Sequence, residues 1–276
     1  MASMTLGQMK NHVIRLCGNH IDALAAEMAI QLKFIEIGES RHWSWRKKSG
    51  LISTIARHSE GTVALNVTTT LVDGTTTSFV AGDIGRYIQI GQDVTFYRIT
   101  NVVGQQLTLE KAYAGASFSG QSYTIFQHIY PLESDFGLME EPYFFNRIRE
   151  ATLREIAEWG ARRYYADIPS HFAFMGQTSA GLQQIQFWPT PSAVIGIRYD
   201  YLSNIAIVTG DATVIPCRPD VLVYVAAADA LHTIISLNPE RFRNQESLAR
   251  RDDEKGTQSL AEYVIEDQQR AGRSRS

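Results

Sequence analysis

The spacing of apolar residues changes twice along this chain, and that change constrains the fold more than any other feature. Over residues 21–37, apolar side chains recur three or four positions apart, which is the spacing of a helix. Over residues 59–131 they fall in short alternating runs rich in threonine, valine, isoleucine and tyrosine, which is typical of strands. Beyond Phe136 the helical spacing returns. The pattern predicts a helical protein interrupted by a β-rich insertion.

Helices are expected over residues 6–16, 21–37, 146–166 and 219–237. The helix over 21–37 has an apolar stripe and a second apolar flank, so we expect other parts of the protein to cover it on more than one side. The stripe contains Ile21, Leu24, Ala25, Met28, Leu32 and Ile35, and the flank contains Ile30, Phe34 and Ile37. The helix over 219–237 is the most apolar, but Asp229 and His232 near its middle favour a core helix over a membrane span.

The insertion over residues 59–131 is expected to contain five or six short strands. The Asp73-Gly74 pair is a tight-turn signal, and further glycines separate the runs. No helical pattern interrupts the strands, so they should form a small barrel or sandwich of their own. The segment HIYPLESDF, residues 128–136, should mark the exit, because Pro131 cannot donate a hydrogen bond to a strand ladder and suits a strand end.

These signals predict an α+β protein, with a helical-bundle core, an inserted small all-β domain (barrel or sandwich) and a β-ribbon. The first part of the helical core is expected over residues 1–58 and the β-domain over 59–131. The second part of the core should take residues 132–238 and include the ribbon over 181–201. The ribbon prediction depends on two alternating runs separated by Thr190-Pro191-Ser192.

The last segment, residues 239–276, has a different composition from the rest. Its apolar residues are sparse, and a mixed cluster of charges runs from Arg251 to Lys255. We expect an extended or conditionally helical tail, outside the core, that orders on a partner surface. The candidate contact residues in this tail are Phe242, Leu248, Leu260, Tyr263 and Val264.

Composition sets broad limits on function. The formal charge of −3 gives no overall basic field that would favour nucleic acid. Cys17 and Cys217 lie far apart, which favours two reduced thiols. The N-terminal residues contain no apolar run of the secretion-signal kind. The seven histidines are scattered singly, and no nucleotide-binding, zinc or nucleophile-elbow motif is present. We therefore expect no catalytic residue, no cofactor and no bound metal.

Four acidic residues offer the best case for an enzyme. Glu133, Asp135, Glu140 and Glu141 could be imagined as the paired carboxylates of a glycoside hydrolase. The competing interpretation is structural, since Ser134-Asp135 is a turn or cap pair and Glu140-Glu141-Pro142 resembles a solvated approach to a helix. The structural interpretation is favoured.

A basic-aromatic patch lies within residues 41–48, RHWSWRKK. Its tryptophans could stack on bases while its cations neutralise phosphates. Alternatively, the tryptophans pack into the core and the cations face the carbonyls at a helix end, or the patch contacts an acidic protein neighbour. Core packing is favoured. The candidate residues for contact with DNA or a neighbour are Trp43, Trp45, Arg46, Lys47 and Lys48.

Several segments, taken in order, resemble the head-to-tail adaptor (neck or head completion) proteins of tailed bacteriophages. The segments that carry the resemblance are YRITNV (97–102), QLTLEKAYAG (106–115), SYTI (122–125) and YPLESDF (130–136). The later FWPTPSAVIGIRYDYL and PDVLVYVAAADAL, and the N-terminal TLGQMKNHVIRLCG, are also similar to the family's ribbon, apolar helix and opening helix. One departure is Glu133, which stands where the family usually has a second proline.

The resemblance implies a non-enzymatic virion protein of the neck, assembled in the host cytoplasm. Such a protein forms a homo-oligomeric ring, commonly of twelve copies, that docks on the portal protein after DNA packaging. It then offers a platform to the tail or to a second neck protein. The C-terminal segment would reach along the portal, and non-specific contact with packaged DNA is possible in such a ring. No membrane partner is expected.

Other functions stay open on the sequence alone. The acidic residues could serve a neck-associated peptidoglycan hydrolase. The chain could also be another virion component, such as a tail terminator or a capsid decoration protein. A host-adhesion module built on the β-domain is a further alternative, in which Phe96, Tyr97 and Tyr113 would present a surface. Alternation of side chains along strands assigns about half of such residues to the domain's own core.

Overall fold

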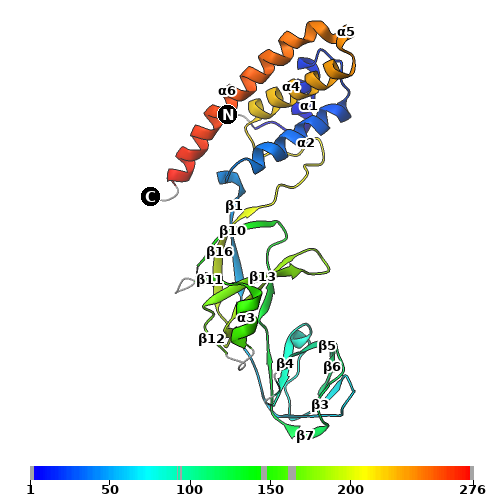
Figure 1. The fold of residues 1–276 in the computed structure, drawn as a ribbon, viewed down its shortest axis with the longest axis vertical. Helices are drawn as coiled ribbons and strands as arrows, with labels where there is room; N and C mark the ends of the chain where they lie inside the picture. The colour runs from blue at the N-terminus through cyan, green and yellow to red at the C-terminus, as the bar shows by residue number, and fades with distance from the viewer. Residues whose placement is uncertain (1–2, 92, 94, 144–147, 161–165, 274–276) are drawn as a thin grey trace. The chain divides into compact units, whose positions relative to one another are not determined.

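The computed structural model describes residues 3–91, 93, 95–143, 148–160 and 166–273 of the 276-residue chain. The chain divides into two compact units (Figure 1). The first, called the helical unit, combines Met1–Lys48 with Leu202–Ser276. The second, called the β unit, is Ser49–Tyr201.

The helical unit is built around one central helix. Its helices are α1 (Leu6–Leu16), α2 (Ala23–Glu39), α4 (Pro219–Leu237), α5 (Pro239–Phe242) and α6 (Glu246–Arg273), with the short 3₁₀ turns η1 (Ser44–Arg46) and η3 (Arg243–Gln245). Helices α1, α2 and α6 all pack against α4 (Figure 1). The predicted bounds of α1 and α4 are confirmed.

Local sequence explains where these helices begin. Thr5 caps α1 in a capping box with Gln8, in which each side chain accepts a hydrogen bond from the other residue's backbone N–H. Asp22 caps α2 by accepting a hydrogen bond from the Ala25 N–H at 2.8 Å. Pro219 occupies the first turn of α4, where no intrahelical partner for an N–H is lost.

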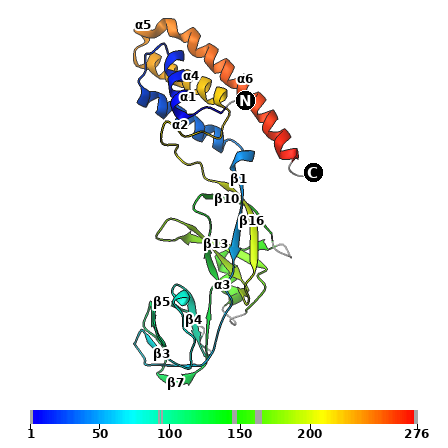
Figure 2. The ribbon, with the colours of Figure 1, turned by 180° about the vertical axis from the view of Figure 1, so that it is seen from behind.

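Small residues allow the helices to approach α4 closely. Ala226, Ala227 and Ala230 of α4 are buried in the core of the unit. On α6, Gly256 faces Val225, and a Cβ at position 256 would lie 2.6 Å from the Val225 Cγ2 atom. Helix α6 therefore lies along α4 at a distance that a larger side chain would prevent (Figure 2).

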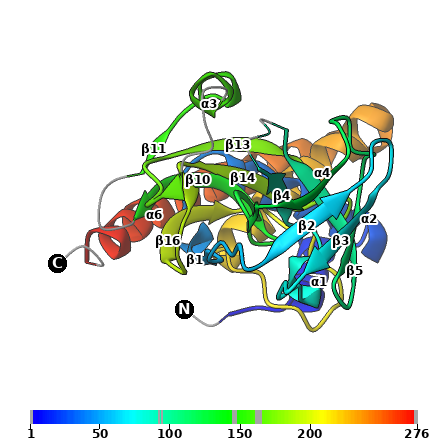
Figure 3. The same cartoon turned by 90° about the horizontal axis from the view of Figure 1, so that it is seen from below.

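The largest sheet of the β unit has seven strands in the order β7-β2-β3-β6-β5-β4-β8. Its strands β2, β3, β4 and β5 are labelled in Figure 3. Its strands are β2 (Thr62–Leu65), β3 (Leu71–Thr75), β4 (Tyr87–Ile90), β5 (Tyr97–Val103), β6 (Gln106–Leu109), β7 (Phe118–Gln121) and β8 (Tyr123–Phe126). The two outermost strands are separated only by Ser122, so the sheet curls into a half-barrel around its own core. His58 and Ile125 exchange backbone hydrogen bonds at 3.0 and 2.9 Å, which ties the start of this segment to its end.

Two smaller sheets and one strand pair complete the β unit. One sheet has the order β1-β16-β10 and the other β11-β13-β14-β9, while β12 pairs with β15. A helix, α3 (Leu153–Gly160), and a 3₁₀ turn, η2 (Ala81–Asp83), also belong to the unit. The strands are β1 (Lys47–Ser53), β9 (Ile129–Pro131), β10 (Phe136–Tyr143), β11 (Arg149–Glu150), β12 (Ala166–Asp167), β13 (His171–Gln177), β14 (Gln183–Trp188), β15 (Thr190–Pro191) and β16 (Gly196–Ser203).

The predicted fold class, a helical-bundle core with a small inserted β-domain and a ribbon, is wrong. The chain is rich in β-structure, and the described part of residues 132–201, which were assigned to the helical core, contains far more strand than helix. Of the helix predicted over 146–166, residues 146–147 and 161–165 lie outside the described part, and only α3 is helical in between. Strand β16 is stabilised by pairing with β1 and β10, which are distant in sequence, and local spacing does not reveal such partners.

The predicted two-stranded ribbon over 181–201 is also different in the structure. Strand β14 pairs with β13 and β9, whereas β16 lies between β1 and β10 in another sheet. The two alternating runs are real strands, but each has its own pair of neighbours. Alternation identifies a strand without identifying its partners.

Candidate functional site

The basic-aromatic patch follows the end of α2, and its aromatic members are packed inside the helical unit. Trp43 is fully buried, and its Nε1–H donates to the Ile37 carbonyl at 2.6 Å. Trp45 stacks on Phe34 with ring centroids 5.5 Å apart. Neither ring is presented for stacking on a base, so this is the arrangement that the core-packing alternative predicts.

The cations of the patch are divided between the interior and the surface. The Arg46 guanidinium donates to the Gly38 carbonyl at 2.7 Å and to the Ser203 carbonyl at 3.0 Å, which ties the end of α2 to the returning chain. Lys47 and Lys48 begin β1 and are exposed. Most of the patch therefore stabilises the packing at the end of α2, and only its two lysines lie on the surface.

The structure brings this patch together with the C-terminal segment. The Tyr263 ring of α6 stacks on Trp43 with centroids 4.6 Å apart and an interplanar angle of 17°. The Ser44 backbone N–H donates to the Asp267 carboxylate at 3.1 Å. Two sets of candidate residues about 220 positions apart in sequence therefore form one contact.

The C-terminal segment does not form the tail, separate from the core, that the sequence suggests. Tyr263 is buried, and Leu248, Leu260 and Val264 pack partly buried against the same core. The Phe242 ring lies 5.2 Å from the ring of His20. The reason lies in the side of α6 that faces α4, where small Ala249 and Gly256 allow close packing without a strong apolar signal.

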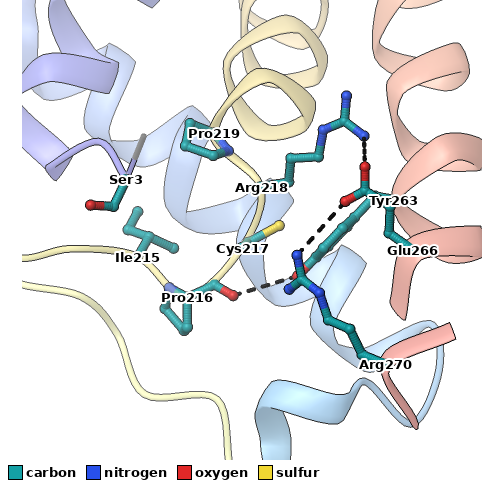
Figure 4. Close-up of a pocket in the computed structure, with 9 residues that line it drawn as sticks. All are labelled: Ser3, Ile215, Pro216, Cys217, Arg218, Pro219, Tyr263, Glu266 and Arg270. Atoms are coloured by element: carbon teal, nitrogen blue, oxygen red, sulfur yellow. Dashed lines mark hydrogen bonds and ion pairs between the residues drawn. The ribbon is translucent and has the colours of Figure 1, made fainter. Parts of the chain in front are cut away.

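A cavity of about 400 Å³ opens beside Tyr263 (Figure 4). Its lining includes residues 215–218 ahead of α4, Pro219 at the start of α4, and Glu266 and Arg270 of α6. The Arg218 guanidinium is 8% exposed and contacts the carboxylates of Asp220, Glu262 and Glu266 at 2.9, 3.0 and 3.2 Å. Burial lowers the pKa of Arg218, but the hydrogen bonds that its guanidinium donates to Asp220 and Glu262 outweigh it and raise that pKa overall.

The chemistry of this cavity is that of a structural ion-pair network. Three carboxylates already surround the guanidinium, and Glu266 also lies 3.8 Å from Arg270. Cys217 is buried, and burial raises its pKa to about 12, so the thiol stays protonated at neutral pH and is a poor nucleophile. The arrangement holds α6 against the start of α4.

A second polar cluster lies in the β unit, where Asp83 is fully buried. Its carboxylate accepts hydrogen bonds from His58 Nε2 and Arg86 Nη1, both at 2.8 Å, and from the Val80 N–H at 3.0 Å. Burial raises the pKa of Asp83, but these hydrogen bonds and the charge of Arg86 lower it overall. Arg86 also donates to the Ala56 carbonyl at 2.7 Å. The cluster fastens η2 to the segment that leads into the seven-stranded sheet.

The acidic candidates are placed as structural residues where their side chains are described. Asp135 accepts a hydrogen bond from the Tyr201 hydroxyl at 2.8 Å, beside a cluster of aromatic rings. The Glu133 N–H donates to the Tyr199 hydroxyl at 3.4 Å. The side chain of Glu141 lies outside the described part of the structure. Across the described residues, no group of three His, Cys, Asp or Glu side chains is arranged to hold a metal ion.

The feature that sequence reasoning missed is on α2. The apolar flank is buried, through Ile30, Phe34 and Ile37, together with Ala26 and Ala29. The apolar stripe, which was expected to be covered, instead exposes Leu24, Met28 and Leu32 by 67%, 57% and 59%. These three residues, called the α2 ridge, lie on one face at intervals of four. Large apolar side chains gathered on one exposed helix face are unusual in a protein that works alone.

Comparisons with known proteins do not assign the chain to a family. Neither the protein-family models nor the curated proteins contain a match. By length and apolar character α4 could cross a membrane, with 44% of its apolar window buried in the protein. Core helices have the same character, and the contacts of α4 with α1, α2 and α6 place it at the centre of the helical unit.

Proposed function

We propose that this chain is a structural virion protein, the head-to-tail adaptor of a tailed bacteriophage. In this role, copies of the chain form a ring that docks on the portal protein after DNA packaging and provides the attachment platform for the tail. The proposal builds on the ordered sequence segments that resemble this family. Some of these segments lie on β5, β6, β8 and β9, and so belong to the framework of the β unit.

The observation that carries the proposal is the α2 ridge. Leu24, Met28 and Leu32 are each more than half exposed, so the helical unit presents an apolar surface suited to another protein. The polar clusters around Arg218 and Asp83 pair their charges within the chain and hold the fold together. A protein with a surface that requires a protein neighbour, and polar groups used for packing, fits assembly better than catalysis.

The proposal gives the candidate contact residues of the C-terminal segment a different role from the one that the sequence suggested. Because Tyr263 is part of the core, its removal would disturb the helical unit itself. A portal contact by this segment would use the outer side of α6, where Ile265 is 55% exposed. Surface substitutions on α6 are therefore a better test of portal binding than deletion of residues 240–276.

Electron microscopy of the purified full-length chain, with and without portal protein, tests the proposal. We expect a ring with the rotational symmetry of the portal, seated on the portal. A chain that remains monomeric and does not bind portal would contradict the adaptor role. A zymogram on peptidoglycan separates the hydrolase alternative, because an adaptor should clear nothing.

A further inference from the structure

The α2 ridge is a fixed surface of the helical unit. Asp22 caps the start of α2, and the Gln31 side chain accepts a hydrogen bond from the Val208 N–H at 3.1 Å. The Lys33 ammonium bridges Glu36 and Asp229 at 2.8 and 3.1 Å, which joins α2 to α4. These contacts fix the rotation of the helix about its axis. The outward direction of Met28 and its neighbours is therefore set by the fold.

No part of the same copy that the structure describes covers this ridge. The opposite side of α2, with Ala26, Ile30 and Phe34, packs on the core that α1 and α4 share. Positions 24, 28 and 32 are two residues from positions 26, 30 and 34, which is about 160° around the helix, so the ridge points away from α1 and α4. The helical unit itself therefore leaves this apolar area in water.

The same unit offers a matching hollow on a different face. A cavity of about 290 Å³ lies between α1 and α4, and apolar side chains form most of its lining. Leu16 contributes from α1, Val223 and Tyr224 contribute from α4, and His12 stands at its side. A helix ridge of alternating Leu and Met side chains is the kind of surface that packs into such a groove.

Helices α2 and α1 are also opposite in charge, and the one carboxylate in the groove lining, that of Asp220 on α4, is already paired with Arg218 at 2.9 Å. The α2 segment, residues 22–39, contains Asp22, Glu27, Glu36 and Glu39 against one lysine, so its formal charge is −4 + 1 = −3. The α1 segment, residues 4–16, contains Lys10 and Arg15 and no acidic residue, so its formal charge is +2. Glu27 already contacts Lys10 within one copy at 3.0 Å, whereas Arg15 and Glu39 have no ion pair within the described residues.

We propose that the α2 ridge of one copy of this chain seats in the α1–α4 groove of the next copy. The partner that covers the ridge is thus a second copy of the chain, which is held by apolar packing and oriented by opposite charge. Because ridge and groove are different surfaces, the contact is head-to-tail and can be repeated around a closed ring. The inference rests on the proposed function for its ring of copies, and adds which surfaces join them.

Cross-linking through introduced cysteines tests this contact. Met28→Cys places a thiol on the ridge, and His12→Cys places one beside the groove; both positions are exposed, so the fold should tolerate them. The native Cys17 and Cys217 are buried and should not react in the folded protein. A short bis-maleimide is added to the full chain, alone at high concentration and bound to portal, and the products are separated by denaturing electrophoresis.

The double variant should give a ladder of cross-linked oligomers, because each copy carries one thiol on each surface. An equal mixture of the two single variants should stop at dimers, and each single variant alone should give none. Leu237→Cys combined with His12→Cys is the matched control, since Leu237 is 72% exposed but belongs to neither surface. This control should produce no ladder.

Three results would overturn the inference, and they separate it from the proposed function. Dimers from Met28→Cys alone would show that two ridges pair with each other. Rings on the portal without a ladder would leave the adaptor role standing and place the subunit contact elsewhere. Absence of rings, portal binding and ladder together would contradict both proposals.

Discussion

The seven-stranded sheet of the β unit and helix α2 of the helical unit differ in how far they bury their apolar side chains. In the β unit, the seven-stranded sheet curls around its own core, so that Val63, Ile88, Ile99 and Leu107 are nearly or fully buried within a single copy. In the helical unit, α2 buries one apolar side and leaves the ridge of Leu24, Met28 and Leu32 in water. The difference teaches that the seven-stranded sheet encloses a core of its own, whereas α2 presents on its outer face a row of large apolar side chains that the helical unit does not bury.

Tyr263→Ala should have the largest effect, and it should fall on the helical unit. The substitution removes a buried ring that stacks on Trp43, and large-to-small changes of this kind cost about 4 kcal/mol. Denaturant unfolding followed by tryptophan fluorescence should show the loss. Ile265→Ala, on the exposed side of the same helix, should cost less than about 0.5 kcal/mol. Equal losses for the two variants would contradict the buried position of Tyr263.

Asp83→Ala should destabilise the β unit by about 3 kcal/mol, because it leaves the Arg86 guanidinium buried without its carboxylate. Hydrogen exchange should show faster opening of β4 and β8, with the helices of the helical unit unchanged. Asp73→Ala is the matched control, since this exposed carboxylate has one hydrogen bond, from Gln106. An equal loss of protection from hydrogen exchange in both units would contradict this prediction, because it would show that the two units unfold together.

Acid should weaken the β unit in two separate steps. His128 is enclosed by the rings of Tyr87, Phe96 and Phe126, and burial lowers its pKa from 6.5 to about 4. A histidine that is neutral in the folded protein contributes stability that is complete above pH 6.5 and is lost as pH falls toward 4, a loss of about 3 kcal/mol. Asp83, whose pKa is lowered from 3.8, contributes stability that is lost only below that value.

Stability curves between pH 7 and pH 3 check this order. His128→Phe keeps an aromatic ring in the cluster and should remove the step between pH 6.5 and 4. It should leave the step below pH 3.8 in place. A wild-type protein whose stability is flat between pH 7 and 4 would contradict the burial of His128.

Met28→Gln should have the smallest effect on stability, within about 0.5 kcal/mol, since the side chain is 57% exposed. Its effect on self-association should be much larger, because the apolar area of the ridge is reduced. Analytical ultracentrifugation across a range of concentrations would measure this. If the variant loses stability but associates normally, the ridge stabilises the single copy and does not contact a second one. This result would contradict the comparison.

Local signals predicted individual elements well. The cap at Thr5, the first-turn proline at 219 and the apolar periods gave the bounds of α1 and α4, and alternation located strands within residues 59–131. Pro131 does end a strand, as a residue without an N–H should, but this strand, β9, pairs with β14 in another sheet, and the seven-stranded sheet already ends with β8. These predictions depend on groups within a few positions of each other, and such groups can be recognised from sequence.

Pairings between distant segments could not be predicted in the same way. Strand β1 reaches its partner β16 across about 150 residues, and nothing in either run specifies the other. Helix α6 was interpreted as a tail because its side toward α4 carries Ala249, Asp252, Gly256 and Tyr263, of which only the last is a large apolar residue. The α2 ridge has the composition of a core stripe, and sequence alone does not say which molecule buries it.

The backbone bridge between His58 and Ile125 gives the seven-stranded sheet an unusual independence. The chain enters and leaves this sheet through two residues that are hydrogen-bonded neighbours, so the intervening 66 residues return to the point where they began. A segment with adjoining ends can be lengthened, exchanged or removed while the strands on either side keep their course. This part of the chain therefore has the geometry of a self-contained insertion, whose length and strands can change without redirecting the chain before His58 or after Ile125.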